Sequence, residues 1–377
     1  MNEHDDVLAS QSGQQESVPQ VTTATNNQEA TTPNTTVGDA VATSANEIGE
    51  VSAQDAISDA QKEFFANAYR SIECEINKVF VGQRELVLGS LVALFSGGHV
   101  LVESVPGLGK TLFASALGRT LGCQFGRIQF TPDLMPSDVV GAPVYNMKTQ
   151  EFQFRPGAVF TQILLADEIN RAPAKTHSAL LEAMQEGAAT VDGTTHVLPA
   201  PFFVIATQNP IESEGTYRLP EAQVDRFMFK LIADYPSEED ELKILADHGK
   251  NIDVREKLAT VQPVLNAEQI LEMRRVVNDV YIAPELFVYI NKIARATRRF
   301  PRIAFGASTR AGLALTQGVR TLALFQGRTF ATPDDVAKIA LPTLRHRVTL
   351  SPEAEIEGRS VDEILTALVR SIEVPRL

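Results

Sequence analysis

An eight-residue loop, Ser104–Thr111, constrains this chain more than any other segment, and it reads Ser-Val-Pro-Gly-Leu-Gly-Lys-Thr. It follows an apolar segment typical of a buried strand, His99–Glu103, and precedes a helical pattern over Leu112–Gly118. Glycines in such a loop expose backbone N–H groups that can surround a triphosphate, and the positive end of the helix dipole points the same way. Lys110 would reach the β- and γ-phosphates, and the Thr111 hydroxyl would bind Mg²⁺. The loop therefore predicts a nucleotide-binding strand, loop and helix.

One position departs from the phosphate-loop pattern G-x-x-x-x-G-K-[ST], because Ser104 stands where the pattern has its first glycine. The remaining loop positions are candidates for nucleotide contacts: Pro106, Gly107, Leu108 and Gly109. A glycine-rich turn without a ligand is the alternative, and Gly-Lys-Thr alone does not exclude it. The strand before the loop and the helix after it favour nucleotide binding.

The net charge of −13 is concentrated at one end of the chain. Residues 1–60 carry ten acidic side chains and no Lys or Arg, so the remainder carries only −3. A nearly neutral body argues against a dedicated nucleic-acid binder. Residues 1–58 are also rich in Thr, Ser, Gln, Asn and Ala and poor in aromatic residues, which predicts a disordered acidic tail.

Neither cysteines nor histidines have the spacing of a disulfide framework or a metal cluster. We expect Cys74 and Cys123 to be buried, reduced thiols. The sequence begins without the basic and apolar regions of a secretory signal, and no apolar run approaches the roughly 18 residues of a membrane span. We therefore expect a cytoplasmic protein with no membrane span.

From Val81 to Tyr235 short apolar strands alternate with helical segments, which predicts an α/β fold with a five-stranded parallel sheet. The expected strands are His99–Glu103, Arg127–Thr131, Gln162–Asp167, Phe202–Asn209 and Phe227–Asp234. Two β-hairpins are expected as insertions: Val139–Tyr145 with Gln150–Phe154, and Ala188–Val191 with His196–Leu198 around Asp192-Gly193.

Three domains are expected, with the tail as residues 1–58, the nucleotide-binding core as 59–235 and a helical domain as 236–377. The first helix should start near Ile57. Three helix starts after residue 235 pair a capping side chain with a partner three residues later, at Ser237, Asn266 and Thr332.

Asp167 ends the expected strand Gln162–Asp167 and Glu168 follows directly, which is the Walker B arrangement. Asp167 would orient Mg²⁺, and Glu168 would polarise the water that attacks the γ-phosphate. An ordinary strand terminus followed by a helix is the alternative. The phosphate loop in the same sheet favours the catalytic interpretation.

Three further polar residues are catalytic candidates. Asn209 ends the expected strand Phe202–Asn209, where it can bind the attacking water and the γ-phosphate, although Asn-Pro is also a common start of a turn. Arg226 is either a surface arginine paired with Asp225 or Glu221, or an arginine finger presented to the γ-phosphate of a neighbouring subunit. Arg310 could reach the same phosphate from the helical domain. A basic set nearby fits a solvated helix face or a subunit contact better than a nucleic-acid site, because no aromatic platform accompanies it: Lys292, Arg295, Arg298, Arg299 and Arg302.

The chain resembles the MoxR family of AAA+ ATPases from about Ile57 to its C-terminus. The resemblance rests on Gly-Leu-Gly-Lys-Thr, Leu-Leu-Ala-Asp-Glu-Ile-Asn-Arg-Ala-Pro, Ala-Thr-Gln-Asn-Pro, Leu-Pro-Glu-Ala-Gln-Val-Asp-Arg-Phe and Gly-Ala-Ser-x-Arg-Ala, in this order. It implies an AAA+ core of the P-loop NTPase class with a helical lid. Departures from the family pattern are Ser104, Arg218 and Thr309, and only Ser104 touches the phosphate loop.

The resemblance also implies a homo-oligomeric ring, usually of six subunits, with ATP and Mg²⁺ held between neighbours. It assigns Lys110 and Thr111 to Walker A, and Val81, Gly82 and Gln83 to the segment near the adenine. It assigns Asp167 and Glu168 to Walker B, Asn209 to sensor 1, Arg226 to the trans-acting finger and Arg310 to sensor 2. The hairpins resemble insertions that face the pore or clients. Family members act as chaperone-like remodellers, often with a partner that carries a von Willebrand factor A domain.

The preferred function is a ring-forming ATPase that remodels or matures a partner complex. A metal-chelatase motor subunit and a non-hydrolysing, nucleotide-gated scaffold are the alternatives. The intact pair Asp167-Glu168 speaks against the scaffold, since a protein that does not hydrolyse ATP has no use for a carboxylate that activates water.

Overall fold

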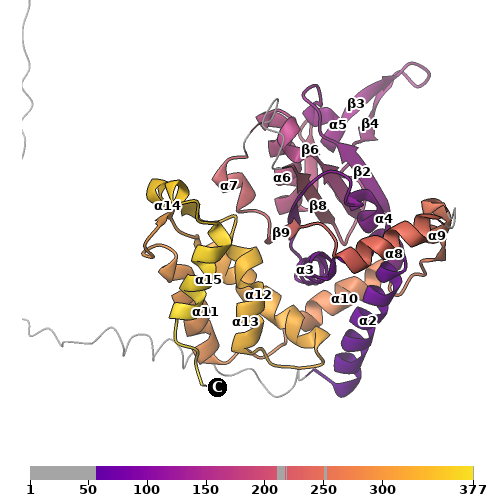
Figure 1. Cartoon of the computed structure of the whole chain (residues 1–377). Coiled ribbons are helices and arrows are strands. Elements are labelled where there is room, and N and C mark those ends of the chain that lie inside the picture. The colour runs from indigo at the N-terminus through magenta and orange to yellow at the C-terminus, as the bar shows by residue number, and fades with distance from the viewer. Residues whose placement is uncertain (1–56, 210–216, 218, 250–252, 377) are drawn as a thin grey trace, which may run out of the picture. The chain divides into compact units, whose positions relative to one another are not determined.

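Five parallel strands form the central sheet in the order β2-β5-β8-β1-β9, which confirms the expected fold class (Figure 1). The strands are β1 (Val100–Ser104), β2 (Phe125–Gln129), β5 (Ile163–Asp167), β8 (Phe203–Gln208) and β9 (Phe229–Ala233). The computed structural model describes residues 57–209, 217, 219–249 and 253–376. Nearly all of the predicted tail 1–58, together with Pro210 and Arg218, lies outside these residues.

Alternation along each strand sends apolar side chains to both faces of the sheet. In β1, Val100 and Val102 join one buried cluster and Leu101 joins another. Three helices from the nucleotide-binding part of the chain pack around the first cluster: α2 (Asp59–Asn77), α3 (Arg84–Phe95) and α4 (Lys110–Thr120). The second face is covered mainly by α6 (Ala174–Glu186). Burial of both faces explains why these strands read as continuous apolar runs.

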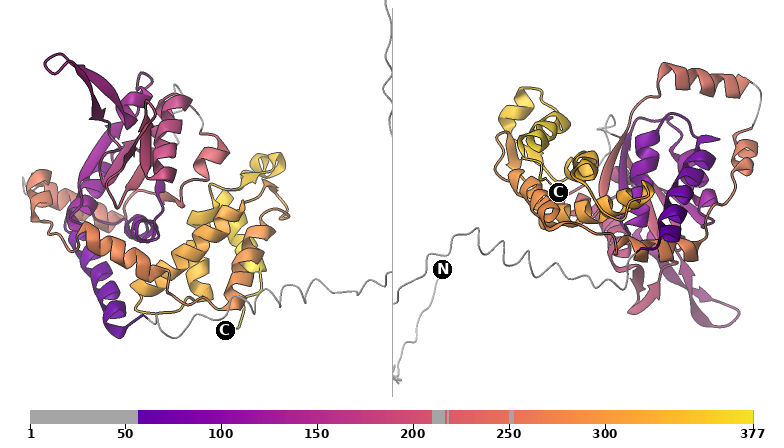
Figure 2. Two further views of the ribbon diagram at one scale, coloured as in Figure 1. Left: turned by 180° about the vertical axis from the view of Figure 1, so that it is seen from behind. Right: turned by 90° about the horizontal axis from the view of Figure 1, so that it is seen from below.

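Two antiparallel hairpins interrupt the core, as expected. They consist of β3 (Gly141–Asn146) with β4 (Glu151–Pro156), and β6 (Ala188–Val191) with β7 (Thr194–Val197). Figure 2 shows the purple hairpin of β3 and β4 projecting beyond the sheet. The expected strand start at Val139 was wrong, because Val139 and Val140 close the short helix α5 (Pro136–Val140), where Val139 is fully buried.

The C-terminal part is helical except for the short pair β10 (Ile303–Phe305) and β11 (Thr349–Leu350). Its helices are α8 (Glu238–Gly249), α9 (Val254–Thr260), α10 (Ala267–Val277), α11 (Pro284–Ala296), α12 (Thr309–Phe325), α13 (Pro333–Leu344), α14 (Pro352–Ile356) and α15 (Val361–Ser371). Capping boxes at Asn266 and Thr332 start α10 and α13, as expected, and another at Ser58 starts α2.

One hydrophobic cluster runs from the sheet into these helices, so the core and the helical part pack as one unit. It includes Phe229 of β9, Val319 of α12 and Ile339 of α13. The division at residue 235 therefore stays a prediction. No helix among the described residues is long and apolar enough to cross a membrane.

One cysteine prediction was wrong. Cys123 is buried, and burial raises the pKa of its thiol to about 11, whereas Cys74 lies on the exposed side of α2.

Candidate functional site

The loop after β1 has the backbone that a phosphate site requires. Gly107 and Gly109 have φ angles of 88° and 75°, a region that favours glycine, and a Cβ on Gly107 would point into open space. Gly109 is the N-cap of α4 and provides no side-chain cap, so the first N–H groups of the helix have no side-chain acceptor there. An uncapped helix N-terminus behind a glycine loop fits a polyphosphate group, with Lys110 and Thr111 as the first two residues of the helix.

The departure at Ser104 lies in the strand and not in the loop. Ser104 is the last residue of β1, pairs with Ala233 of β9 and is only 2% exposed. Its buried Oγ has no hydrogen-bond partner among the described residues. The serine side chain therefore occupies interior space below the phosphate loop.

The segment Val81–Gln83 lies beside the phosphate loop. The Gln83 amide donates a hydrogen bond to the carbonyl of Asp234, just after β9. Phe80 packs on Phe113 of α4, and a Cβ on Gly109 would lie 3.5 Å from the Phe80 ring. The structure thus brings the expected adenine segment next to the expected phosphate segment.

Asp167 lies at the carboxyl end of β5 and is 6% exposed. Its Oδ1 accepts a hydrogen bond of 2.6 Å from the Thr207 hydroxyl of β8. Its Oδ2 accepts one of 2.7 Å from the Arg127 guanidinium of β2. Both neighbouring strands therefore fix this carboxylate, and nothing in the motif itself identified Thr207 or Arg127.

Glu168 follows at a sharp turn, with φ 55° and ψ 48°. For a residue with a Cβ this left-handed conformation is strained and often marks a functional position. Its backbone N–H donates to the Thr207 hydroxyl (2.9 Å), and its Oε2 accepts from Gln129 Nε2 (2.8 Å) and from Arg171 (3.0 Å). Gln129 was missed from the sequence, although Gln129 and Asp167 face each other in the β2–β5 register.

Oxygen-bearing side chains near the loop fit Mg²⁺, which usually keeps several water ligands and takes only one or two carboxylates from the protein. Asp167 supplies such a carboxylate, and Thr111 supplies a hydroxyl at the start of α4. Across the described part of the chain, no group of three or more His, Cys, Asp or Glu side chains forms an all-protein metal cluster.

Asn209 follows β8 at the same edge of the sheet as Asp167 and Ser104, because all five strands run parallel. It is 6% exposed and, with Gln208, lines a cavity of about 680 Å³. The Gln208 amide donates to Glu103 Oε2, which also pairs with Lys230 Nζ at 2.7 Å. None of the loop residues 105–111 lines this cavity, so it is distinct from the phosphate loop.

Arg226 and Arg310 lie at the opposite edge. Arg226 precedes β9, and Phe229 at the start of β9 pairs with Val100 at the start of β1. Arg310, near the start of α12, approaches Asp225 to 3.6 Å. Both arginines line a cavity of about 210 Å³ next to Gln185, near the end of α6. Asp225, one of the two carboxylates that the sequence offered as partners for Arg226, is therefore close to Arg310.

Two family profiles match the chain. The profile of the ATPase family associated with various cellular activities (AAA) matches residues 99–229, and that of the AAA lid domain matches residues 295–368.

Individual relatives cover most of the chain. The uncharacterized protein YeaC of Bacillus subtilis is 47% identical over 300 residues, 80% of this chain and 92% of the relative. Chaperone MoxR1 of Mycobacterium tuberculosis is 40% identical over 312 residues, 80% of this chain and 81% of the relative. The crystal structure of a candidate ATPase from Cytophaga hutchinsonii matches with a TM-score of 0.77 and 40% identity, over 84% of this chain and 97% of that one.

Proposed function

Because the chain belongs to the MoxR family of AAA+ ATPases, we propose that it forms a ring whose ATP hydrolysis remodels or matures a partner protein complex. Family membership makes the chain an ATPase with a chaperone-like role. The ring, the residue roles and the nature of the partner are the parts we add.

The proposed roles follow the site geometry. Lys110 binds the β- and γ-phosphates, the backbone N–H groups of residues 107–109 surround them, and Val81–Gln83 contacts the adenine. Thr111 and Asp167 would hold Mg²⁺, which would supply positive charge to the phosphate oxygens.

Glu168 accepts the proton of the attacking water, and Asn209 orients that water against the γ-phosphate. Gln129 and Arg171 hold the Glu168 carboxylate in the geometry described above. Glu168 must turn from these two donors toward the water, so release of the carboxylate is part of the proposed cycle.

The observation that carries the ring is the position of the two arginines. The phosphate loop follows the carboxyl end of β1, whereas Arg226 precedes the amino end of β9. The five residues of β9 alone span about 13 Å. An arginine at that edge is poorly placed for the ATP of its own subunit, which supports a composite site where Arg226 and Arg310 serve the neighbour's γ-phosphate.

Six subunits, and a partner with a von Willebrand factor A domain, are the finer expectations that the family suggests, and both stay predictions. The chelatase alternative is less well supported than the remodeller, since the likeness to Chaperone MoxR1 covers 80% of this chain.

Single substitutions and mixtures test the proposal. We expect Lys110→Ala and Glu168→Gln to lower ATP turnover at least about 100-fold, because each removes a group that acts on the reacting phosphate. Arg226→Ala should bind nucleotide yet hydrolyse it slowly. Mixing Arg226→Ala with Lys110→Ala should restore turnover above the sum of the two separate activities, since some interfaces then combine an intact loop with an intact finger.

The outcomes separate the claims. Parent-like turnover in both Lys110→Ala and Glu168→Gln would contradict the catalytic assignment. Absence of recovery at every mixing ratio would contradict the composite site.

A further inference from the structure

One buried arginine, Arg347, forms hydrogen bonds with the backbone on both sides of Arg226. Its side chain is only 3% exposed, and it lies between α13 and β11 in the helical part. A guanidinium has five N–H donors, and here five hydrogen bonds use them. The acceptors are Asp225 Oδ1 (2.7 Å), Asp225 O (3.2 Å), Phe227 O (2.6 Å), Met228 O (3.0 Å) and Thr343 O.

Three of these acceptors are backbone carbonyls on either side of Arg226. Asp225 precedes it, and Phe227 and Met228 follow it. The carbonyls of the turn are therefore fixed by one planar group from the helical part. The Arg226 side chain lines the cavity that it shares with Arg310 and also a second cavity, of about 200 Å³, beside Ser178 and Glu182 of α6.

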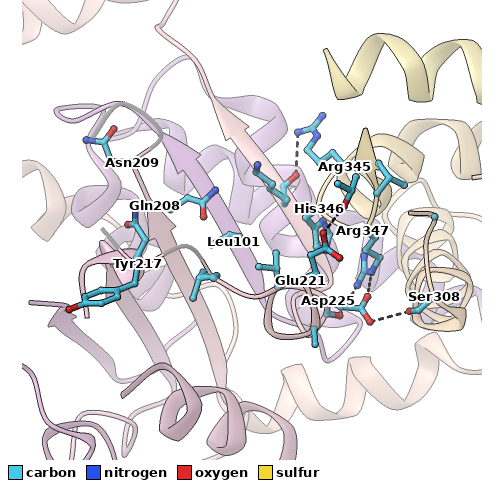
Figure 3. A pocket seen from close by; sticks show the side chains of 18 residues that line it. Leu101, Gln208, Asn209, Tyr217, Glu221, Asp225, Ser308, Arg345, His346 and Arg347 are labelled. Atoms are coloured by element: carbon cyan, nitrogen blue, oxygen red, sulfur yellow. Dashed lines mark hydrogen bonds and ion pairs between the residues drawn. The ribbon is translucent and has the colours of Figure 1, made fainter. Parts of the chain in front are cut away.

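The Asp225 carboxylate joins this arginine to the second candidate. Its Oδ2 accepts a hydrogen bond of 3.0 Å from the hydroxyl of Ser308, the N-cap of α12 (Figure 3). The same Oδ2 lies 3.6 Å from the Arg310 guanidinium. Burial lowers the pKa of Arg347, and the bonds to Asp225 oppose that shift. A buried guanidinium without a carboxylate partner is costly, so Asp225 and Arg347 depend on each other.

We propose that Asp225 and Arg347 are positioning residues that hold Arg226 and Arg310 as one unit aimed at the neighbouring subunit. The pair connects the helical part to the turn that carries Arg226, so a displacement of the helical part changes the aim of both arginines together. This inference rests on the proposed role of Arg226 in trans.

If the contact between Asp225 and Arg347 were purely structural, the expected result would differ. Loss of the contact would then destabilise the whole subunit, including the subunit's own phosphate loop. A positioning role affects only the site that the subunit completes in its neighbour. The two can be separated by asking which half of the composite site a variant damages.

The test uses Asp225→Asn and Arg347→Lys in the full-length protein. Asp225→Asn keeps the shape of the side chain and removes its charge, and Arg347→Lys keeps the charge and removes the planar fork. We expect kcat to fall about 10- to 100-fold, as for a small misplacement of a catalytic group, with the ATP KM nearly unchanged. Mixing either variant with Lys110→Ala should restore turnover above the sum of the separate activities.

Arg345→Lys is the matched control. Arg345 also links the helical part to the core, through Lys230 O at 3.2 Å, and pairs with Asp362 at 2.8 Å, but it makes no bond to residues 225–228. The Arg345→Lys variant should hydrolyse ATP at nearly the rate of the parent protein. Thermal unfolding of each variant shows whether the fold survives. Ser308→Ala removes the hydroxyl that donates to the Asp225 carboxylate and accepts from the Arg310 N–H, and it gives a milder perturbation if Arg347→Lys fails to fold.

Each result decides between the possibilities. Unchanged kcat in folded Asp225→Asn and Arg347→Lys overturns the positioning role. Failure of these variants to recover on mixing, while Arg226→Ala does recover, also overturns it and indicates a structural contact. If Arg226→Ala itself fails to recover, the composite site is wrong, which is a distinct outcome.

Discussion

At the scale of single residues, the carboxylates of the candidate site are fixed by hydrogen bonds that no sequence motif predicted. Glu168 was identifiable because a paired acid ends an apolar strand, but its partner Gln129 comes from a different strand. Likewise, Arg127 and Thr207 hold the two oxygens of Asp167. Each is an ordinary strand residue, and only the register β2-β5-β8 brings it to the carboxylates. Predicting them requires the order of the strands, which local pattern does not contain.

His99 provides a prediction at the same scale. Its ring is buried beneath the sheet, where Nδ1 accepts from the Val204 N–H (3.1 Å) and Nε2 therefore donates to the Met184 carbonyl (3.2 Å). The bond from Val204 needs an unprotonated Nδ1 and therefore the neutral ring, and burial lowers the pKa of His99 from 6.5 to about 4. As the pH falls below 6.5, the His99 ring becomes protonated in the unfolded chain but stays neutral in the folded protein. The folded state therefore loses stability between pH 6.5 and 4.

We expect His99 to reduce the free energy of unfolding by about 1.4 kcal/mol between pH 7.5 and 5.5, which corresponds to one pKa unit. Denaturant unfolding of the parent and of His99→Gln at both pH values measures it. The variant should be less stable at pH 7.5 but should lose less stability on acidification. Other histidines contribute equally to both proteins. An identical pH dependence in parent and variant would contradict the assignment.

At the scale of elements, alternation and turn signals predicted the five strands and both hairpins, and their boundaries shifted by only a few residues. The strand expected at Arg127–Thr131 is Phe125–Gln129, because pairing with β5 begins at Phe125. Val139 was misassigned because a buried apolar residue fits the end of a short helix as well as a strand. Tertiary packing decides between the two, and it cannot be read from a short apolar run.

Gly157, directly after β4, gives the prediction for this scale. A Cβ at this position would overlap the backbone N of Gly141 and the carbonyl of Val139. Neighbouring residues fix that backbone, since Ala158 and Val159 donate to the carbonyls of Asp138 and Val139 at 3.1 and 3.0 Å. Because backbone atoms cannot move aside as a flexible side chain can, Gly157→Ala should cost about 1–3 kcal/mol.

Gly312→Ala is the control, since the nearest atom to its Cβ, on Ile290, would be 4.0 Å away. It lies within α12, so alanine should leave stability unchanged or raise it by up to about 1 kcal/mol. Urea unfolding measures both variants. If Gly157→Ala unfolds at the same urea midpoint as the parent, the backbone at the base of the hairpin can move aside to accommodate a Cβ.

At the scale of the whole molecule, the two halves of the candidate site lie at opposite edges of one sheet. The loop motif predicted one half, whereas the residues left Arg226 open between a surface arginine and an arginine finger, and the resemblance favoured the finger. The structure adds that Arg310 lies near Arg226 through Asp225, although 84 positions separate the two arginines in the chain. Such a contact depends on how the helical part packs against β9, which no local signal describes.

A composite site makes assembly depend on nucleotide. ATP bound by one subunit would attract Arg226 and Arg310 of the next, and the lost γ-phosphate would weaken that attraction after hydrolysis. Glu168→Gln should bind ATP without turning it over, so it should populate the assembled state longest. We expect its mass by sedimentation velocity to be a multiple of the 41.1 kDa chain with ATP and smaller with ADP. Lys110→Ala, which loses the phosphate contact, should not respond to ATP. A Glu168→Gln protein that keeps the mass of one chain at saturating ATP would show that the arginines at the far edge serve something other than a neighbour's nucleotide.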